Sequence, residues 1–337
     1  EDIPADTLAW NKTLDAALQR APDAAFLLSA GDQVDSHSNE FQYEGLLSSS
    51  VWDSLPMAPT IGNHDTSSKY FTYHFNVPNP TKDNVTAAGG NYTFQYGETL
   101  FVVLNGNADD GDGFRRTFAA ATAACPDYRW LVVCLHQDIY GSGTHTTTKE
   151  LQDLRATLFP ILDEYMADIV LTGHDHSYTR AYILRGDEKA VVRQNAAGEA
   201  MYPFGTLYIT AGSSSGSKYY PLVGDDIEYV DISLQPGEPT YSLVQVSHDA
   251  LTIATYRTAS GDVVDTYTLT KVIDASVLRD AVGQAEELLA GTHPSDASWA
   301  LLEQRLAVAK PLLTNEAAEA AQLYDAVRGL RLAIVGL

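Results

Sequence analysis

Four short apolar segments of this chain each run directly into residues that can bind a metal ion. They lead into Gly31-Asp32, Gly62-Asn63-His64-Asp65, His136 and Gly173-His174-Asp175-His176. Amphipathic stretches at 7–20 and 148–166 accompany these segments, and a mixture of strands and helices is typical of an α/β sheet. Open α/β sheets place their active sites at the carboxyl ends of the strands, so we expect these residues to meet there.

The donor atoms in these four clusters favour a particular kind of metal site. Asp32 alone is explained by a turn, and a lone His136 by packing in the core. Four of the nine histidines lie in the clusters, however, and separate structural roles do not explain that concentration. Carboxylate, amide oxygen and imidazole without thiolate suit Mn²⁺, Zn²⁺ or iron. A carboxylate shared by two cations would make the site dinuclear.

The strong negative charge limits the partners of the chain. Its 337 residues carry a formal net charge of −23, with 45% hydrophobic and 19% charged residues, as in a globular protein. Nucleic-acid duplexes and anionic membrane surfaces are excluded because both demand clustered Lys and Arg. An anionic substrate is allowed where bound cations reverse the local field. No apolar run reaches the roughly 18 residues of a transmembrane helix, and Cys125 and Cys134 are expected to be free thiols.

The composition changes near residue 273. Residues 1–273 mix helical and strand patterns, and the part from Leu207 onward is more purely β, which predicts stacked mixed sheets with flanking helices. Residues 274–337 are rich in Ala and Leu at helical spacing, which predicts an antiparallel three-helix bundle with a structural or spacer role. We expect its second helix to be capped by Ser295 and its third to start at Asn315.

The four motifs in this order resemble those of the calcineurin-like metallophosphoesterases. The stretch 173–180 is most similar to the purple acid phosphatase branch. The resemblance covers 1–273 and implies an α/β sandwich that hydrolyses a small phosphoester with a metal-bound hydroxide at two divalent or trivalent ions (Mn, Zn or Fe). The tail at 274–337 resembles the FIVAR module through Ser298-Trp299 with Leu302 and Leu306, which implies an extracellular or cell-surface protein associated with the cell wall.

The resemblance also assigns roles to individual residues. The metal ligands would be Asp32 bridging both ions, Asn63, His136 and His174 at the second ion, and His176 at the first. His64 would donate a proton to the leaving group or stabilise its charge, with Asp65 orienting it. Weaker candidates are Tyr178 and Arg180 for substrate contact and Asp35 as a carboxylate behind the ligands or a turn residue. The loop histidines His37, His74 and His145 are weak candidates for lining the cleft.

One departure from the family keeps other functions open. The family begins with a strand ending in Asp-x-His, which we expect to lie upstream of Glu1, so that the first metal site of this chain is depleted. A non-catalytic surface module that keeps the phosphatase fold as a binding platform is one alternative. A phosphodiesterase or nucleotidase with the same site is another.

Overall fold

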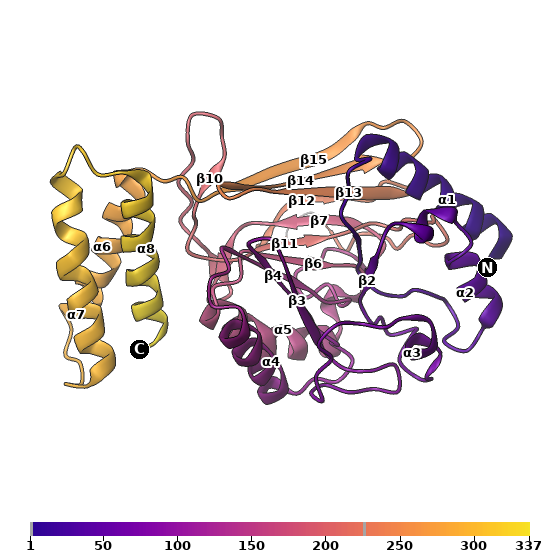
Figure 1. The fold of residues 1–337 in the computed structure, drawn as a ribbon, viewed down its shortest axis with the longest axis horizontal. Helices are drawn as coiled ribbons and strands as arrows, with labels where there is room; N and C mark the ends of the chain where they lie inside the picture. The colour runs from indigo at the N-terminus through magenta and orange to yellow at the C-terminus, as the bar shows by residue number, and fades with distance from the viewer. Residues whose placement is uncertain (1–2, 225–226) are drawn as a thin grey trace. The chain divides into compact units, whose positions relative to one another are not determined.

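The computed structural model of this protein describes residues 3–224 and 227–337. Its α/β fold has helices flanking mixed β-sheets (Figure 1), which confirms the predicted fold class. The chain forms two compact units. The first holds the described residues up to Lys189 with 205–243 and 254–266, and the second holds 190–204, 244–253 and 267–337. Within the described ranges, no helix is both long and apolar enough to cross a membrane.

A seven-stranded mixed sheet lies in the first unit. Its strands in order are β12 (Val230–Leu234), β7 (Tyr178–Ala181), β11 (Leu207–Thr210), β6 (Ile169–Thr172), β5 (Trp130–Cys134), β4 (Thr99–Val103) and β3 (Tyr92–Tyr96). Strands β4, β5, β6 and β11 are parallel, whereas β3, β7 and β12 run antiparallel to their neighbours. The carboxyl ends of β5 and β6 therefore lie at the same edge.

Helices α4 (Gly111–Ala124) and α5 (Lys149–Glu164) cover one face of this sheet. Their side chains pack against alternate residues of β4 and β5 in a cluster that includes Phe114, Phe118, Leu154 and Leu158 with Leu100, Val102, Leu131 and Val133. Successive strand residues point to opposite faces, so Cys134 and Leu171 lie on the other face, where Leu28 packs beside them. Burial on both faces explains the continuous apolar runs. Both Cys134 and Cys125 are free thiols, as predicted.

A separate parallel pair of strands, β1 (Leu27–Ser29) and β2 (Met57–Pro59), brings the first two motifs into the site. The other elements of the first unit are short, apart from the first helix: α1 (Ile3–Arg20), α2 (Glu40–Leu46), α3 (Tyr70–His74), β8 (Leu184–Arg185), β9 (Glu188–Lys189) and the 3₁₀ turns Ser50–Asp53 and Thr144–Thr147. A four-stranded sheet has the order β10 (Ala200–Met201), β15 (Val263–Thr270), β14 (Ala250–Arg257) and β13 (Thr240–Val246).

The carboxyl-terminal segment of the second unit forms three helices, α6 (Ala275–Leu289), α7 (Ala297–Ala309) and α8 (Ala320–Val335), with a 3₁₀ turn at Lys310–Thr314. Asp274 caps α6, because its carboxylate accepts a hydrogen bond from the Ser276 backbone N–H. Two predicted starts are wrong. Asp296 caps α7 in place of Ser295. Helix α8 begins after Glu319 and not at Asn315, because the capping box between Glu319 and Gln322 satisfies backbone amides at the start of the helix.

Burial in this bundle differs sharply between two neighbouring leucines. Leu302 is fully buried, whereas Leu301 is 41% exposed. We expect Leu302→Ala to lower the free energy of unfolding by about 2–5 kcal/mol, because it removes buried methyl groups and leaves a cavity. The matched Leu301→Ala change should stay within about 0.5 kcal/mol. Urea denaturation followed by circular dichroism measures both, and equal losses would contradict the described packing.

Candidate metal centre

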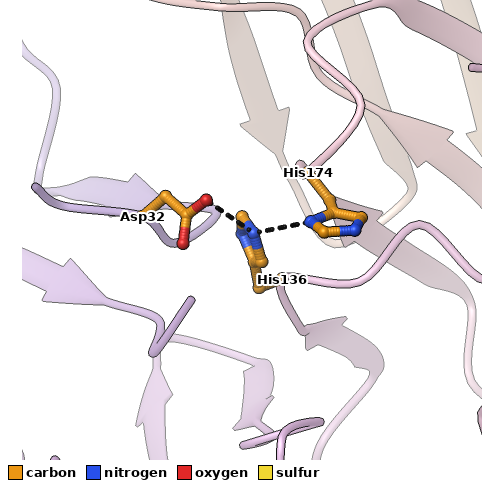
Figure 2. Close-up of side chains that lie close together, drawn as sticks. All are labelled: Asp32, His136 and His174. Atoms are coloured by element: carbon orange, nitrogen blue, oxygen red, sulfur yellow. Dashed lines mark hydrogen bonds and ion pairs between the residues drawn. The ribbon is translucent and has the colours of Figure 1, made fainter. Parts of the chain in front are cut away.

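The structure brings residues of all four predicted clusters to one place. Asp32 and Asn63 follow β1 and β2, while His136 and His174 follow β5 and β6. One donor atom each from Asp32, His136 and His174 can be chosen so that all three lie within 4.8 Å of one another. Figure 2 shows the His136 ring between the Asp32 carboxylate and the His174 ring. The predicted residues are thus brought together, and their role as metal ligands stays a prediction.

Electron-rich atoms crowd around one nitrogen of His136. Its Nδ1 lies 2.8 Å from the Ala30 carbonyl, to which it donates, so Nε2 faces the site. That Nε2 lies 3.1 Å from Asp32 Oδ2, 3.1 Å from Asn63 Oδ1 and 3.2 Å from His174 Nδ1. A single proton on Nε2 cannot serve three acceptors at once. The arrangement fits a cation with nitrogen and oxygen ligands.

Burial and neighbouring charges govern protonation in this group. Burial and the imidazoles of His136 and His145 lower the pKa of His174 to about 3, so its ring is neutral and ready to bind a metal. Burial opposes ionisation of Asp32, but His136 outweighs it and holds the pKa of Asp32 below its ordinary value. Burial likewise disfavours the His136 imidazolium, and Asp32 overrides it and raises the pKa of His136. The two shifts favour an ion pair between the Asp32 carboxylate and the His136 imidazolium, whose proton a metal would displace.

The backbone at three of the predicted ligands has a strained conformation of the kind that is common at functional sites. Asp32, His174 and His176 have φ angles of 48°, 74° and 50°, in the left-handed region. Two glycines allow the loops to approach closely. A Cβ atom on Gly62 would lie 2.0 Å from Asp32 Oδ1, and one on Gly31 would lie 2.5 Å from His136 Nδ1. No other residue fits either position without moving a ligand.

His176 lies beside this group but is not one of its three members. Its Nδ1 donates to the Lys218 carbonyl at 2.9 Å, which leaves Nε2 as the acceptor. Burial lowers the pKa of His176, so the neutral ring is favoured. The ring centroid lies 5.2 Å from that of Tyr220. Its predicted role at a first metal ion stays a prediction.

Asp65 does not hold the ring of His64, contrary to the predicted orienting role. The fully buried Asp65 carboxylate accepts from the backbone N–H groups of Gly62 at 2.8 Å and Gln33 at 3.2 Å, and so ties the Asp32 loop to the Asn63 loop. Burial and the nearby Asp32 charge raise the pKa of Asp65 to about 7.

The ring of His64 is positioned by Asp35 instead. His64 Nδ1 donates to the Asp35 backbone carbonyl at 2.6 Å, while the Asp35 carboxylate lies 3.8 Å from the same nitrogen. The backbone N–H of His64 donates to Asp32 Oδ1 at 2.9 Å. Asp35 therefore holds the ring of His64 through its backbone carbonyl. The sequence predicted either a carboxylate behind the ligands or a turn residue at this position.

Tyr178 and Arg180 belong to a buried network, which corrects their prediction as substrate contacts. Arg180 forms ion pairs with Asp265 at 2.6 Å and Asp231 at 2.5 Å, and the Tyr178 hydroxyl donates to Asp265 at 2.8 Å. Both side chains are buried. Their polar groups are engaged by carboxylates that satisfy them, so they stabilise the strands that follow the last motif.

His145, one of the three loop histidines predicted as candidates to line the cleft, lies beside His174. Its Nδ1 and its backbone N–H both contact the buried Asp175 carboxylate, and the N–H distance is 3.1 Å. Its ring centroid lies 4.6 Å from that of His174 and 4.8 Å from that of Tyr220. The sequence signal for this contact is the aspartate between two histidines of the last motif, because a buried carboxylate needs a partner.

The network around Arg180 leads to a prediction about stability. Arg180→Ala should lower the free energy of unfolding by about 3–5 kcal/mol, because it leaves the largely buried Asp265 carboxylate without its charged partner. Arg115→Ala is the matched control, since Arg115 pairs with Glu164 at 3.2 Å on the surface. That change should cost less than about 1 kcal/mol. Urea denaturation measures both, and a mild effect of Arg180→Ala would contradict the structural role.

Residues 5–178 match the family model described as calcineurin-like phosphoesterase. Two uncharacterized Mycobacterium tuberculosis proteins, MT2654 and Rv2577, are each 26% identical over 155 residues, which is 39% of this chain and 29% of theirs. The chain thus spans less than a third of the length of these relatives.

Solved structures share the fold at low sequence identity. Purple acid phosphatase PPD1 from yellow lupin (Lupinus luteus) seeds has a TM-score of 0.59 at 15% identity, with 77% of this chain and 49% of that chain covered. GAP50, described as the anchor in the inner membrane complex of Plasmodium, has a TM-score of 0.55 at 14% identity. The match covers 78% of this chain and 84% of GAP50.

Proposed function

Because the chain belongs to the calcineurin-like phosphoesterase family, we propose that it is a metal-dependent hydrolase of phosphate esters. One observation carries this proposal: the Asp32, Asn63 and His174 donor atoms converge on His136 Nε2 at 3.1–3.2 Å. Such crowding is relieved by a cation. The shared fold with a purple acid phosphatase supports the same reaction class.

Asp32, Asn63, His136 and His174 would hold one ion, and His176 together with Asp32 would contribute to a second. Mn, Zn or Fe suits these nitrogen and oxygen donors. Bound ions supply neutralisation of the phosphate oxygens and a water of lowered pKa. They also explain how a chain of net charge −23 accepts an anionic substrate. The dinuclear arrangement rests on the resemblance of the motifs.

The chain itself supplies two histidines for proton transfer and orientation. His64 keeps its ring partly exposed, with Nδ1 on the Asp35 carbonyl, so Nε2 is the atom that would donate a proton to the leaving group. His145 is held by the buried Asp175 carboxylate and would orient a phosphate oxygen through Nε2. We propose a small phosphomonoester as substrate, with phosphodiesters and nucleotides as alternatives for the same site.

Hydrolysis of an aryl phosphate in the presence of Mn²⁺, Zn²⁺ or iron tests this proposal. We expect activity that chelation abolishes, because the ligand set needs its cation. His174→Ala should lose both Mn²⁺ binding and activity. His64→Asn should lower kcat about 10²- to 10⁴-fold while Mn²⁺ affinity stays unchanged, as for a general acid. His248→Asn, at an exposed position, is the control and should leave both unchanged.

A parallel panel of aryl phosphodiesters, nucleotides and pyrophosphate separates the substrate classes. The loops 35–43, 69–93 and 213–222 are the segments in which we expect specificity to lie, since loops carry specificity on this kind of scaffold. Absence of hydrolysis across the whole panel, with Mn²⁺ bound, would overturn the enzymatic proposal.

That last outcome would favour a non-catalytic binding platform. GAP50 has a similar fold and is described as an anchor, so this fold also occurs in a protein named for attachment. The convergent ligand atoms favour the enzyme, because a platform has no need to bury them. Cell-wall association, an extracellular location, the FIVAR-like nature of the tail and a domain boundary at 273/274 stay predictions from the resemblance and the change in composition.

A further inference from the structure

The candidate ligands come from two separate sheets. Asp32 and Asn63 follow the two-stranded β1–β2 sheet, whereas His136 and His174 follow strands of the seven-stranded sheet. The spacing of 3.1 Å between Asn63 Oδ1 and His136 Nε2 therefore depends on contacts that join one sheet to the other. Metal affinity depends on this spacing, because a ligand displaced by a fraction of an ångström binds poorly.

Asn107, which lies beyond the end of β4, joins the two loops directly. Its Nδ2 donates to the Ile61 carbonyl at 3.2 Å, two residues before Asn63. Its Oδ1 accepts from Gln137 Nε2 at 2.8 Å, and Gln137 directly follows His136. One amide group thus contacts residues that lie one or two positions from a candidate ligand of each sheet.

The orientation of the Asn107 amide is determined by a third partner. Its Nδ2 also donates to Asn105 Oδ1 at 2.9 Å. Asn105 is buried, and it is held in turn by the Asn91 side chain and the Gly89 carbonyl. A flipped amide would place oxygen against two oxygens, so the donor and acceptor ends of Asn107 cannot exchange. Neither a carboxylate nor an apolar side chain makes this set of bonds.

We propose that Asn107 is a positioning residue of the metal centre, which sets the distance between Asn63 and His136 without touching the metal. This inference rests on the proposed metal-dependent function. Loss of the amide should weaken Mn²⁺ binding about tenfold, the lower end of the range for groups that hold metal ligands in place.

Tyr92 in β3, the neighbour of β4, supplies a control. The Tyr92 hydroxyl donates to the Pro59 carbonyl at 3.0 Å, so it too joins the seven-stranded sheet to β2, but four residues before Asn63. Tyr92→Phe removes that buried bond and keeps the ring. It should lower stability while leaving Mn²⁺ affinity unchanged within about twofold, because the bond lies outside the ligand loop.

The experiment measures Mn²⁺ dissociation constants for the full chain by calorimetry and by the electron paramagnetic resonance signal of free Mn²⁺. Unmodified protein is compared with Asn107→Ala, Gln137→Leu and Tyr92→Phe, and urea denaturation in chelator reports stability without metal. We expect Asn107→Ala and Gln137→Leu each to raise the dissociation constant about tenfold. If Asn107→Ala fails to fold, Gln137→Leu carries the test, because it removes the bond to the His136 loop.

Two outcomes would overturn the inference alone. One is unchanged Mn²⁺ affinity in the folded variants of the Asn107–Gln137 pair. The other is an equal loss of affinity in Tyr92→Phe, which would indicate general loosening of the sheets. Unmodified protein that binds none of Mn²⁺, Zn²⁺ and iron would overturn the proposed function, and this inference with it.

Discussion

The crowding of electron-rich atoms at His136 Nε2 is the constraint on which the rest of the site depends. Left alone, the Asp32 carboxylate, the Asn63 amide oxygen and the His174 nitrogen would repel one another. The structure holds them together by bonds made away from the crowded point: the Ala30 carbonyl fixes the His136 ring, and backbone amides fix Asp32 and Asp65. The protein carries the cost of an arrangement that a cation would stabilise.

Some of these restraining bonds join loops of one sheet, and others cross from one sheet to the other. Asp65 joins the loops after β1 and β2, while Asn107 and the His136 ring reach from the seven-stranded sheet to the smaller one. Side-chain bonds thus position ligands where no strand pairing exists between the two sheets. The apolar core formed by α4 and α5 supplies rigidity, and these few buried polar groups supply the position of each ligand.

Much of the site could be predicted because its signals are local in the sequence. Each apolar strand leads directly into a candidate ligand. Because β5 and β6 are parallel, their carboxyl ends bring His136 and His174 to the same edge of the sheet. The errors arose where the deciding partner is distant. Arg180 bonds to Asp265, which lies 85 positions further along the chain. His145 bonds to Asp175, which lies 30 positions away, so neither pairing leaves a local pattern in the sequence. The cap of α7 was missed by one residue, because Ser295 and Asp296 are both good caps.

The left-handed backbone at Asp32, His174 and His176 has a consequence for how this family can change over time. Asn, Asp and His are the non-glycine residues that most readily adopt this conformation, and glycine adopts it freely. If these predicted ligands bind metal, replacing one of the two histidines by glycine would remove metal binding without refolding the turn. Catalysis and architecture can be inherited separately at these positions, so descendants of such a chain can abandon the chemistry and keep the scaffold.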